Sequence, residues 1–134
     1  PKIKTISAMI LYGQENISKS YELYSLGLAH FDKNEFGTAS EKFIEAIALN
    51  PVDYTFYENT GMALIKDKKF QKAIPFLEKV IEGEFNPRNG KSEYGLGVIY
   101  SYLEDTENAC KFFTKAMALN YKPAFYDHSK VCIN

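Results

Sequence analysis

The residues that could carry acid–base, nucleophilic or metal chemistry are few and widely spaced. The chain has two histidines, His30 and His128, and two cysteines, Cys110 and Cys132. The cysteines fit no zinc or redox spacing, and a metal site built from all four residues would require distant segments to converge. Gly95-Leu96-Gly97 does not follow a predicted strand, as a phosphate-binding loop would. We therefore expect no catalytic site, no cofactor and no metal.

The composition excludes several kinds of partner. The 134 residues carry a net charge of −1, which gives no overall attraction to nucleic acid or to an anionic membrane. A hydrophobic content of 46% with 15% aromatic residues excludes a disordered chain. No apolar stretch reaches the roughly 18 residues of a membrane span, so no membrane insertion is expected. We expect both cysteines to be free and packed as small hydrophobic residues, which favours a reducing, cytoplasmic compartment.

A repeat organises the sequence. Three glycines are separated by 61 − 27 = 34 and 97 − 61 = 36 residues, and each is followed at fixed distances by an alanine, a large apolar residue and a small residue. A proline then closes each unit, at 51 − 27 = 24, 87 − 61 = 26 and 123 − 97 = 26 residues after the glycine. The glycines are Gly27, Gly61 and Gly97, and the alanines are Ala39, Ala73 and Ala109. The large apolar residues are Phe43, Leu77 and Phe113, and the small residues are Ala46, Val80 and Ala116. The prolines are Pro51, Pro87 and Pro123.

The spacing within one unit predicts a pair of helices. Leu23, Leu26, Gly27 and His30 follow the i, i+3, i+4, i+7 pattern of one helix face, and residues 39–47 repeat the pattern. The glycine allows two antiparallel helices to approach closely, while the large residue of the second helix fills the space beside it. We expect His30 to be packed in this core. A proline ends each unit, because the residue before it avoids the helical conformation.

These residues resemble the tetratricopeptide repeat family. The resemblance is best in residues 20–53, which carry Leu23, Leu26-Gly27, His30, Ala39, Phe43, Ala46 and Pro51 at the family's positions. It implies an all-α fold, a right-handed superhelix of antiparallel helix hairpins, with repeats at 20–53, 54–89 and 90–123. Residues 1–19 are expected to form a helical flank, interpreted as a remnant of a preceding repeat. Residues 124–134 are expected to form a capping helix.

A second apolar stripe on the first helix of each repeat predicts a binding surface. A helix that is apolar on two faces must bury both, and in this family the first helices line a concave groove. The resemblance places eleven residues there: Tyr21, Tyr24, Leu28, Phe31, Glu58, Met62, Ile65, Lys91, Tyr94, Val98 and Tyr102. Glu58, Lys66, Asp32 and Lys91 are expected to orient a ligand. Two alternatives remain open: some rings, Tyr24 among them, pack between neighbouring helices, or a terminal segment of the chain fills the groove.

One ligand class is rejected on the residues. Family members that clamp a chaperone's C-terminal carboxylate use a set of Lys, Asn and Arg side chains, and here those places hold Tyr24, Leu28, Asn59, Lys91 and Gly95. The Lys of the first repeat and the Arg of the third are missing, so bidentate recognition of a carboxylate is not expected.

Two functions follow from different classes. The first is a protein–protein interaction module that holds a peptide or partner protein in the groove. The second is a structural role in which the chain assembles as a homodimer through its terminal helices or its groove. For the first, replacing Tyr94 and Tyr102 with Ala is expected to abolish binding and to leave stability nearly unchanged.

Overall fold

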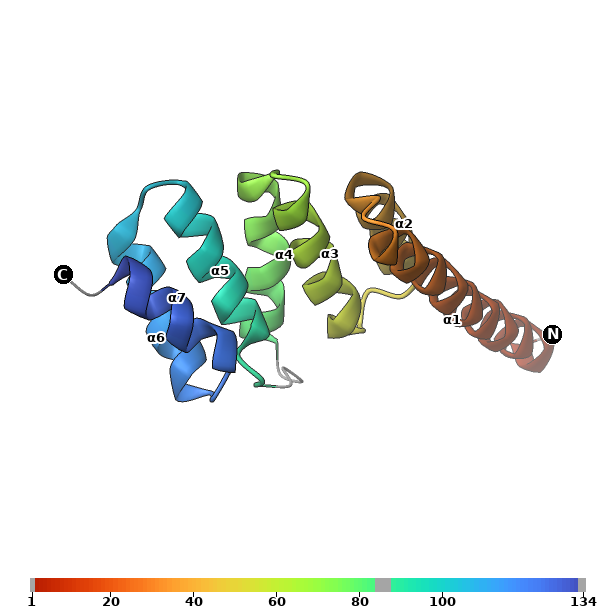
Figure 1. The fold of residues 1–134 in the computed structure, drawn as a ribbon. Coiled ribbons are helices and arrows are strands. Elements are labelled where there is room, and N and C mark those ends of the chain that lie inside the picture. Colours follow the sequence, from red (N-terminus) through yellow and green to blue (C-terminus); the bar gives the residue numbers. More distant parts are fainter. Residues whose placement is uncertain (1, 84–87, 133–134) are drawn as a thin grey trace.

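The chain folds as a row of helices. The computed structural model describes residues 2–83 and 88–132, with the side chains from residue 6 onward, so that Pro87 and Ile133 lie outside it. Within these residues there are seven helices and no strand: α1 (Lys2–Asp32), α2 (Phe36–Leu49), α3 (Tyr54–Lys66), α4 (Phe70–Glu82), α5 (Lys91–Tyr102), α6 (Thr106–Ala118) and α7 (Lys122–Val131). Figure 1 shows the hairpins side by side, with the two termini at opposite ends. The predicted all-α helical-repeat fold is confirmed.

Close contact between the two helices of each hairpin explains the repeated glycines. A Cβ atom added to Gly27 would lie 2.5 Å from the Phe43 ring, and one added to Gly61 would lie 2.4 Å from Leu77. The third hairpin repeats the relationship between Gly97 and Phe113, at 2.5 Å. Contacts this short are not tolerated, so any larger residue would push the helices apart. Each second helix also packs on the first helix of the next hairpin, which makes the core continuous.

The turn inside each hairpin is built in the same way. Asn34, Lys68 and Glu104 all adopt a left-handed backbone conformation, with φ of 62°, 61° and 60°. They are separated by 68 − 34 = 34 and 104 − 68 = 36 residues, the spacing of the glycines. The left-handed residue ends one helix and reverses the chain for the next. His30, near the first of these turns, is not in the core as expected: its side chain is 30% exposed and pairs with Glu35, with 3.3 Å between Nδ1 and Oε1.

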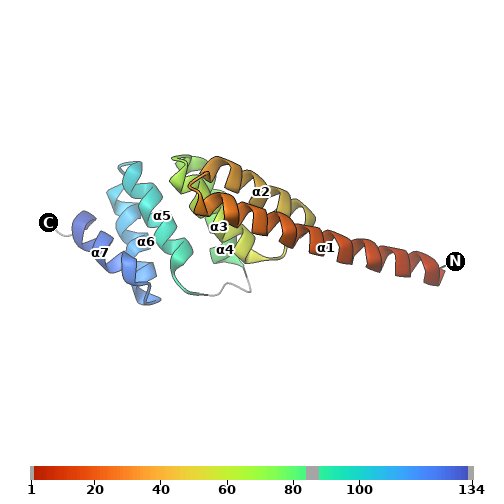
Figure 2. The same cartoon turned by 45° about the vertical axis from the view of Figure 1, so that its right-hand side comes forward.

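The N-terminal flank is not a separate element. Helix α1 runs without a break from Lys2 to Asp32, so the expected flank 1–19 and the first helix of the first repeat form one helix of 31 residues. No turn separates them, and the flank is therefore not the second helix of a preceding hairpin. α2 has only 14 residues and covers the second half of α1. Figure 2 shows the first half projecting beyond the rest of the protein.

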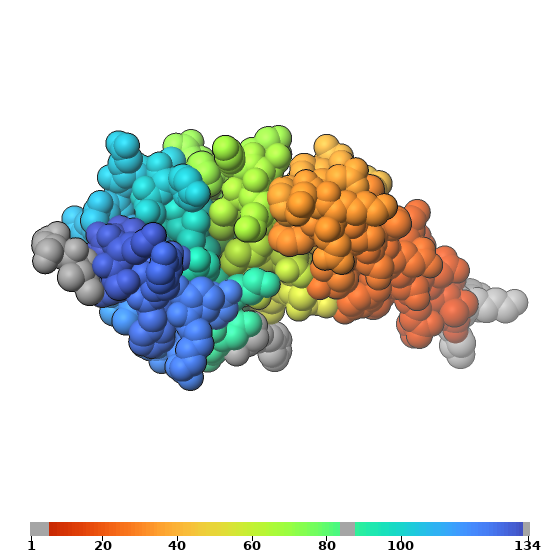
Figure 3. Space-filling model, in the orientation of Figure 1, coloured from red at the N-terminus to blue at the C-terminus, as the bar shows by residue number. Residues whose placement is uncertain are grey.

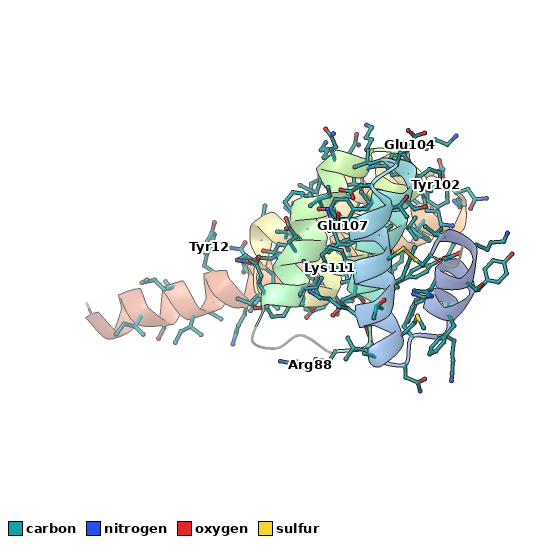
Figure 4. The ribbon with its side chains drawn as sticks, turned by 90° about the vertical axis from the view of Figure 1, so that its left-hand side faces the viewer. Tyr12, Arg88, Tyr102, Glu104, Glu107 and Lys111 are labelled. Atoms are coloured by element: carbon teal, nitrogen blue, oxygen red, sulfur yellow. A yellow bond between two sulfur atoms is a disulfide. The ribbon has the colours of Figure 1, made fainter. Side chains whose placement is uncertain are left out.

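The C-terminal helix is fixed to the third hairpin by a disulfide. α7 begins at Lys122, packs on α6 and buries Ala124. Cys110 of α6 is bonded to Cys132 at the end of α7, with 5.7 Å between their Cα atoms (Figure 4). The expectation of two free cysteines was therefore wrong. The sequence separation of 22 concealed the pairing, because it depends on α7 folding back along α6.

Two further findings concern the described residues only. None of the helices is both long and apolar enough to cross a membrane. Among the described residues, no group of three or more His, Cys, Asp or Glu side chains is placed to share a metal ion.

Candidate peptide-binding groove

A depression on the described surface lies between the first helices of the second and third hairpins and α7. It has a volume of about 470 Å³. Met62 and Ile65 of α3 form one wall, and Val98 of α5 forms the floor beside Gly95. The other lining residues are Lys66, Lys68, Phe70, Tyr94, Ser101, Tyr102, Phe113, Asp127 and Val131. We call this depression the groove.

Close packing at Gly95 sets the depth of the groove. A Cβ atom on Gly95 would lie 2.8 Å from Leu77 and 2.9 Å from the methyl group of Met62. Only a glycine lets α3 and α5 approach to this distance while leaving the surface hollow above them. A side chain at position 95 would require Leu77 and Met62 to move.

Tyr94 is part of the wall and of the protein's own packing. Its ring contacts Phe113 of α6 and Tyr121, with ring centroids 5.9 and 5.1 Å apart. Burial raises the pKa of the Tyr94 hydroxyl well above its ordinary value of 10.0, and a hydrogen bond donated to Asp127 of α7 raises it further. Tyr94 therefore ties α5 to both α6 and α7. The expectation that it could be removed without loss of stability does not fit these contacts.

Tyr102 is placed differently. It is 65% exposed, and its ring stacks on Phe70 with 4.7 Å between centroids and 11° between planes. One face of the ring is covered by Phe70, and much of the rest of the side chain is open to a ligand. Figure 4 shows Tyr102 at the end of α5, close to the turn that holds Glu104.

The groove residues predicted on the first helix serve mainly to join α1 to its neighbours. The Tyr21 hydroxyl donates a 2.6 Å hydrogen bond to Asp53, and the Tyr24 hydroxyl accepts one of 2.8 Å from Asn59. Both rings also contact Phe56 of α3, at 5.2 and 4.9 Å between centroids. The alternative in which such rings pack between neighbouring helices describes both tyrosines.

Ionisation of these two tyrosines is also disfavoured. The hydrogen bond to Asp53 is the main reason why the pKa of Tyr21 is raised. Burial is the main reason for Tyr24, with the nearby Asp53 charge adding to it.

Three more predicted residues lie outside the groove. Glu58 is 8% exposed and accepts a 2.6 Å hydrogen bond from Ser92, so it joins α3 to α5 in the interior. Phe31 packs edge-on against Phe36 of α2, with 5.0 Å between centroids. Leu28 is 36% exposed and does not line the groove.

The remaining predicted residues fall into two sets. Lys91, at the start of α5, is half-buried and lies outside the lining, as does the exposed Asp32. Five of the eleven predicted residues line the groove: Met62, Ile65, Tyr94, Val98 and Tyr102. Lys66, which was expected to orient a ligand, also lines it.

The sequence reasoning missed the contribution of the second helices and of α7. Phe70 and Phe113 reach the groove from α4 and α6, and Asp127 and Val131 reach it from α7. Val131 directly precedes Cys132, so the disulfide holds this wall in place. The signal that could have located the α7 wall was the cysteine pair. α7 thus forms one side of the groove, and up to residue 132 the chain does not fill it.

Two segments, residues 54–82 and 94–123, match the model of the tetratricopeptide repeat family. These two segments are tetratricopeptide repeats. The Hsp70-Hsp90 organizing protein of Triticum aestivum is 30% identical over 99 residues, which cover 74% of this chain and 17% of that protein. The chain spans less than a fifth of the length of the curated relatives it matches.

Solved tetratricopeptide repeat domains share the fold. The TPR domain of Arabidopsis OM64 superimposes with a TM-score of 0.78 at 23% identity, covering 87% of this chain and 97% of that domain. The first TPR of Spaghetti (RPAP3), bound to the HSP90 peptide SRMEEVD, gives 0.77 at 20% identity, covering 86% and 91%. At these identities the likeness shows the fold alone.

Proposed function

We propose that this tetratricopeptide repeat chain is a protein-interaction module and that the groove between α3, α5 and α7 holds a segment of the partner. The observation that carries the proposal is the combination of an apolar hollow of about 470 Å³ with the exposed ring of Tyr102 at its edge. Concave apolar sites with a few polar groups are the usual form of a ligand site. Aromatic residues contribute much of the affinity where a ligand buries them. Proteins with this fold act as interaction modules, and we infer no catalytic role for this chain.

The lining indicates what the bound segment carries. Met62, Ile65 and Val98 are half-buried and present an apolar surface, which favours a large aliphatic or aromatic side chain as the anchor. Lys66 and Lys68 are exposed at the edge, so a carboxylate next to the anchor would be favoured by charge. Asp127 accepts a hydrogen bond from Tyr94.

The geometry argues against recognition of a C-terminal carboxylate. The Asn59 amide donates a hydrogen bond to Tyr24, which uses one of the two N–H groups of a side chain that such a clamp would need. Lys91 lies outside the groove lining. Position 95 admits no arginine without displacing Leu77 and Met62. We therefore expect the peptide SRMEEVD, which the Spaghetti domain binds, to bind this chain weakly or not at all.

The proposal is tested by selecting ligands from a random 12-residue peptide library and measuring binding by fluorescence anisotropy. Val98→Glu, which places a charge on the groove floor, should reduce the affinity of the selected peptides at least about tenfold. Glu78→Lys, on the exposed face of α4, is the matched control and should leave it unchanged. If selected peptides bind both variants equally well, the groove is not the site. Tight binding of SRMEEVD would contradict the ligand class.

A further inference from the structure

The projecting half of α1 carries a row of apolar side chains that nothing in the described structure covers. Ile6, Ile10 and Ile17 are 56%, 55% and 48% exposed, and Met9 beside them is 68% exposed. Figure 3 shows this half of the helix extending away from the rest of the protein, at the end opposite α7. Single exposed apolar residues are common, but a continuous row on one helix marks a contact surface.

This row lies on the face that α1 uses to pack against α2. The row at Ile6, Ile10, Gly13 and Ile17 continues at residues 20, 24, 27 and 31, with alternating steps of four and three. Steps of this kind keep residues on one side of a helix. The second half of the row is buried or half-buried in the first hairpin. The first half presents the same kind of surface with no helix on it.

Gly13 gives the surface a specific shape. Glycine within a helix lowers stability by about 1 kcal/mol relative to alanine. At Gly27, Gly61 and Gly97 a large side chain packs directly on the glycine, and this packing offsets the loss. A Cβ atom on Gly13 would meet nothing within 4 Å. The fold of this chain therefore does not require a glycine there. The glycine leaves a hole between Ile10 and Ile17 that would accept a large side chain from another helix.

We propose that the occupant of this surface is the same half of α1 from a second copy of the chain, running antiparallel. In that arrangement Ile10 of each copy sits on Gly13 of the other, and Ile6 of each lies opposite Ile17 of the other. The row is therefore complementary to itself, large against small, as a two-fold interface requires. The hole and the side chain that fills it belong to one helix, which favours a second copy over an unrelated partner.

The charges of the segment are compatible with the pairing. Between Ile6 and Ile17 the only charged residue is Glu15. In the antiparallel arrangement Glu15 of one copy lies nearest Ala8 of the other, so the two Glu15 side chains are kept apart. Val52, in the loop after α2, is exposed. It is next to Asp53, which accepts a hydrogen bond from Tyr21 of α1. The end of the partner helix would reach Val52. This surface is separate from the groove, so the two proposals can fail independently.

The experiment is the mass of the full 134-residue chain by light scattering, from about 1 to 200 µM, on the unmodified protein and on matched variants. The unmodified chain should change from the mass of one copy to that of two. Ile10→Glu should weaken the dimer about a hundredfold or more, because it buries a charge in the contact. Leu11→Glu adds the same charge at the next position, on another side of the helix, and should leave the dimer intact.

Gly13→Ala separates this proposal from a general effect on the helix. In one copy the new methyl group meets nothing, so helicity measured by circular dichroism should be equal or higher. In the dimer it should obstruct Ile10 of the other copy and weaken association about tenfold. A single-copy mass at every concentration would overturn the proposal. A dimer that is equally sensitive to Ile10→Glu and Leu11→Glu, or is strengthened by Gly13→Ala, would also overturn it.

Discussion

Tyr102 of α5 stacks face to face on Phe70 of α4, with their centroids 4.7 Å apart and their planes 11° apart, while 65% of Tyr102 stays exposed. The pair joins the second hairpin to the third at the edge of the groove. The ring of Tyr102 is thus held in place by one neighbour and is still available to another.

Tyr102→Ala should therefore separate binding from stability. The exposed ring contributes little to the core, so the free energy of unfolding should fall by less than about 1 kcal/mol. Affinity for a groove peptide should fall at least about tenfold, because a ligand that covers this ring would bury a large aromatic surface. Urea unfolding and fluorescence anisotropy on the same protein test both. A large loss of stability would mean that the ring belongs to the core.

Tyr94→Ala should, in contrast to Tyr102→Ala, cause a large loss of stability. The ring contacts Phe113 and Tyr121, and its hydroxyl is bonded to Asp127, so truncation should lower the free energy of unfolding by about 3 kcal/mol. Tyr94→Phe keeps the ring and should cost about 1 kcal/mol, the usual contribution of a hydrogen bond. If both variants unfold at the same urea concentration as the unmodified protein, α7 is not held in the way described.

Tyr94 also predicts how stability depends on alkaline pH. The folded protein raises the pKa of the hydroxyl above its ordinary value of 10.0, so it favours the neutral form. The unfolded chain loses this proton first as the pH rises. The stabilisation is therefore complete below pH 10 and is lost as the pH rises above it. Stability measured from pH 8 to 11.5 should fall less steeply in Tyr94→Phe, and an unchanged slope would contradict the assignment.

The fold was predictable because its determinants repeat. Gly27, Gly61 and Gly97 are close-packing positions whose spacing is visible in the sequence, and each pairs with a large residue in a fixed place. The site was less predictable, because a groove position on a first helix does not reveal what lies across from it. Glu58 has the position of a ligand-binding residue, yet Ser92, which makes it part of the interior, comes 34 residues later. The missing information was contact between repeats.

The Cys110–Cys132 disulfide should stabilise the folded protein by about 3 kcal/mol, the chain-entropy value for a loop closed over a separation of 22 residues. Cys132→Ser, or reduction with a dithiol, should lower the free energy of unfolding by that amount. Urea unfolding with and without the reductant measures it. The Cys132→Ser variant is the control for the reductant and should show no further change when the dithiol is added.

The turn residue Glu104 offers a stabilising substitution. It is exposed and has φ of 60°, a conformation that costs an ordinary residue about 1 kcal/mol and glycine almost nothing. Glu104→Gly should raise the free energy of unfolding by about 0.5–1 kcal/mol. Glu104→Ala removes the same charge but keeps the Cβ atom, and should give no such gain. Equal effects of the two variants would assign the change to the charge.

The disulfide at one end of the row has a consequence for the order in which the protein opens. In a repeat array each hairpin is supported by its neighbours, and the outermost elements normally fray first. Here a disulfide joins α7 to α6, whereas no other element of the described structure packs on the first half of α1. At concentrations low enough for the protein to be a single copy, amide hydrogen exchange should accordingly be fastest near the N-terminal end and slow progressively toward α5 and α6. Unfolding of the array is therefore expected to begin at its N-terminal end, away from the disulfide.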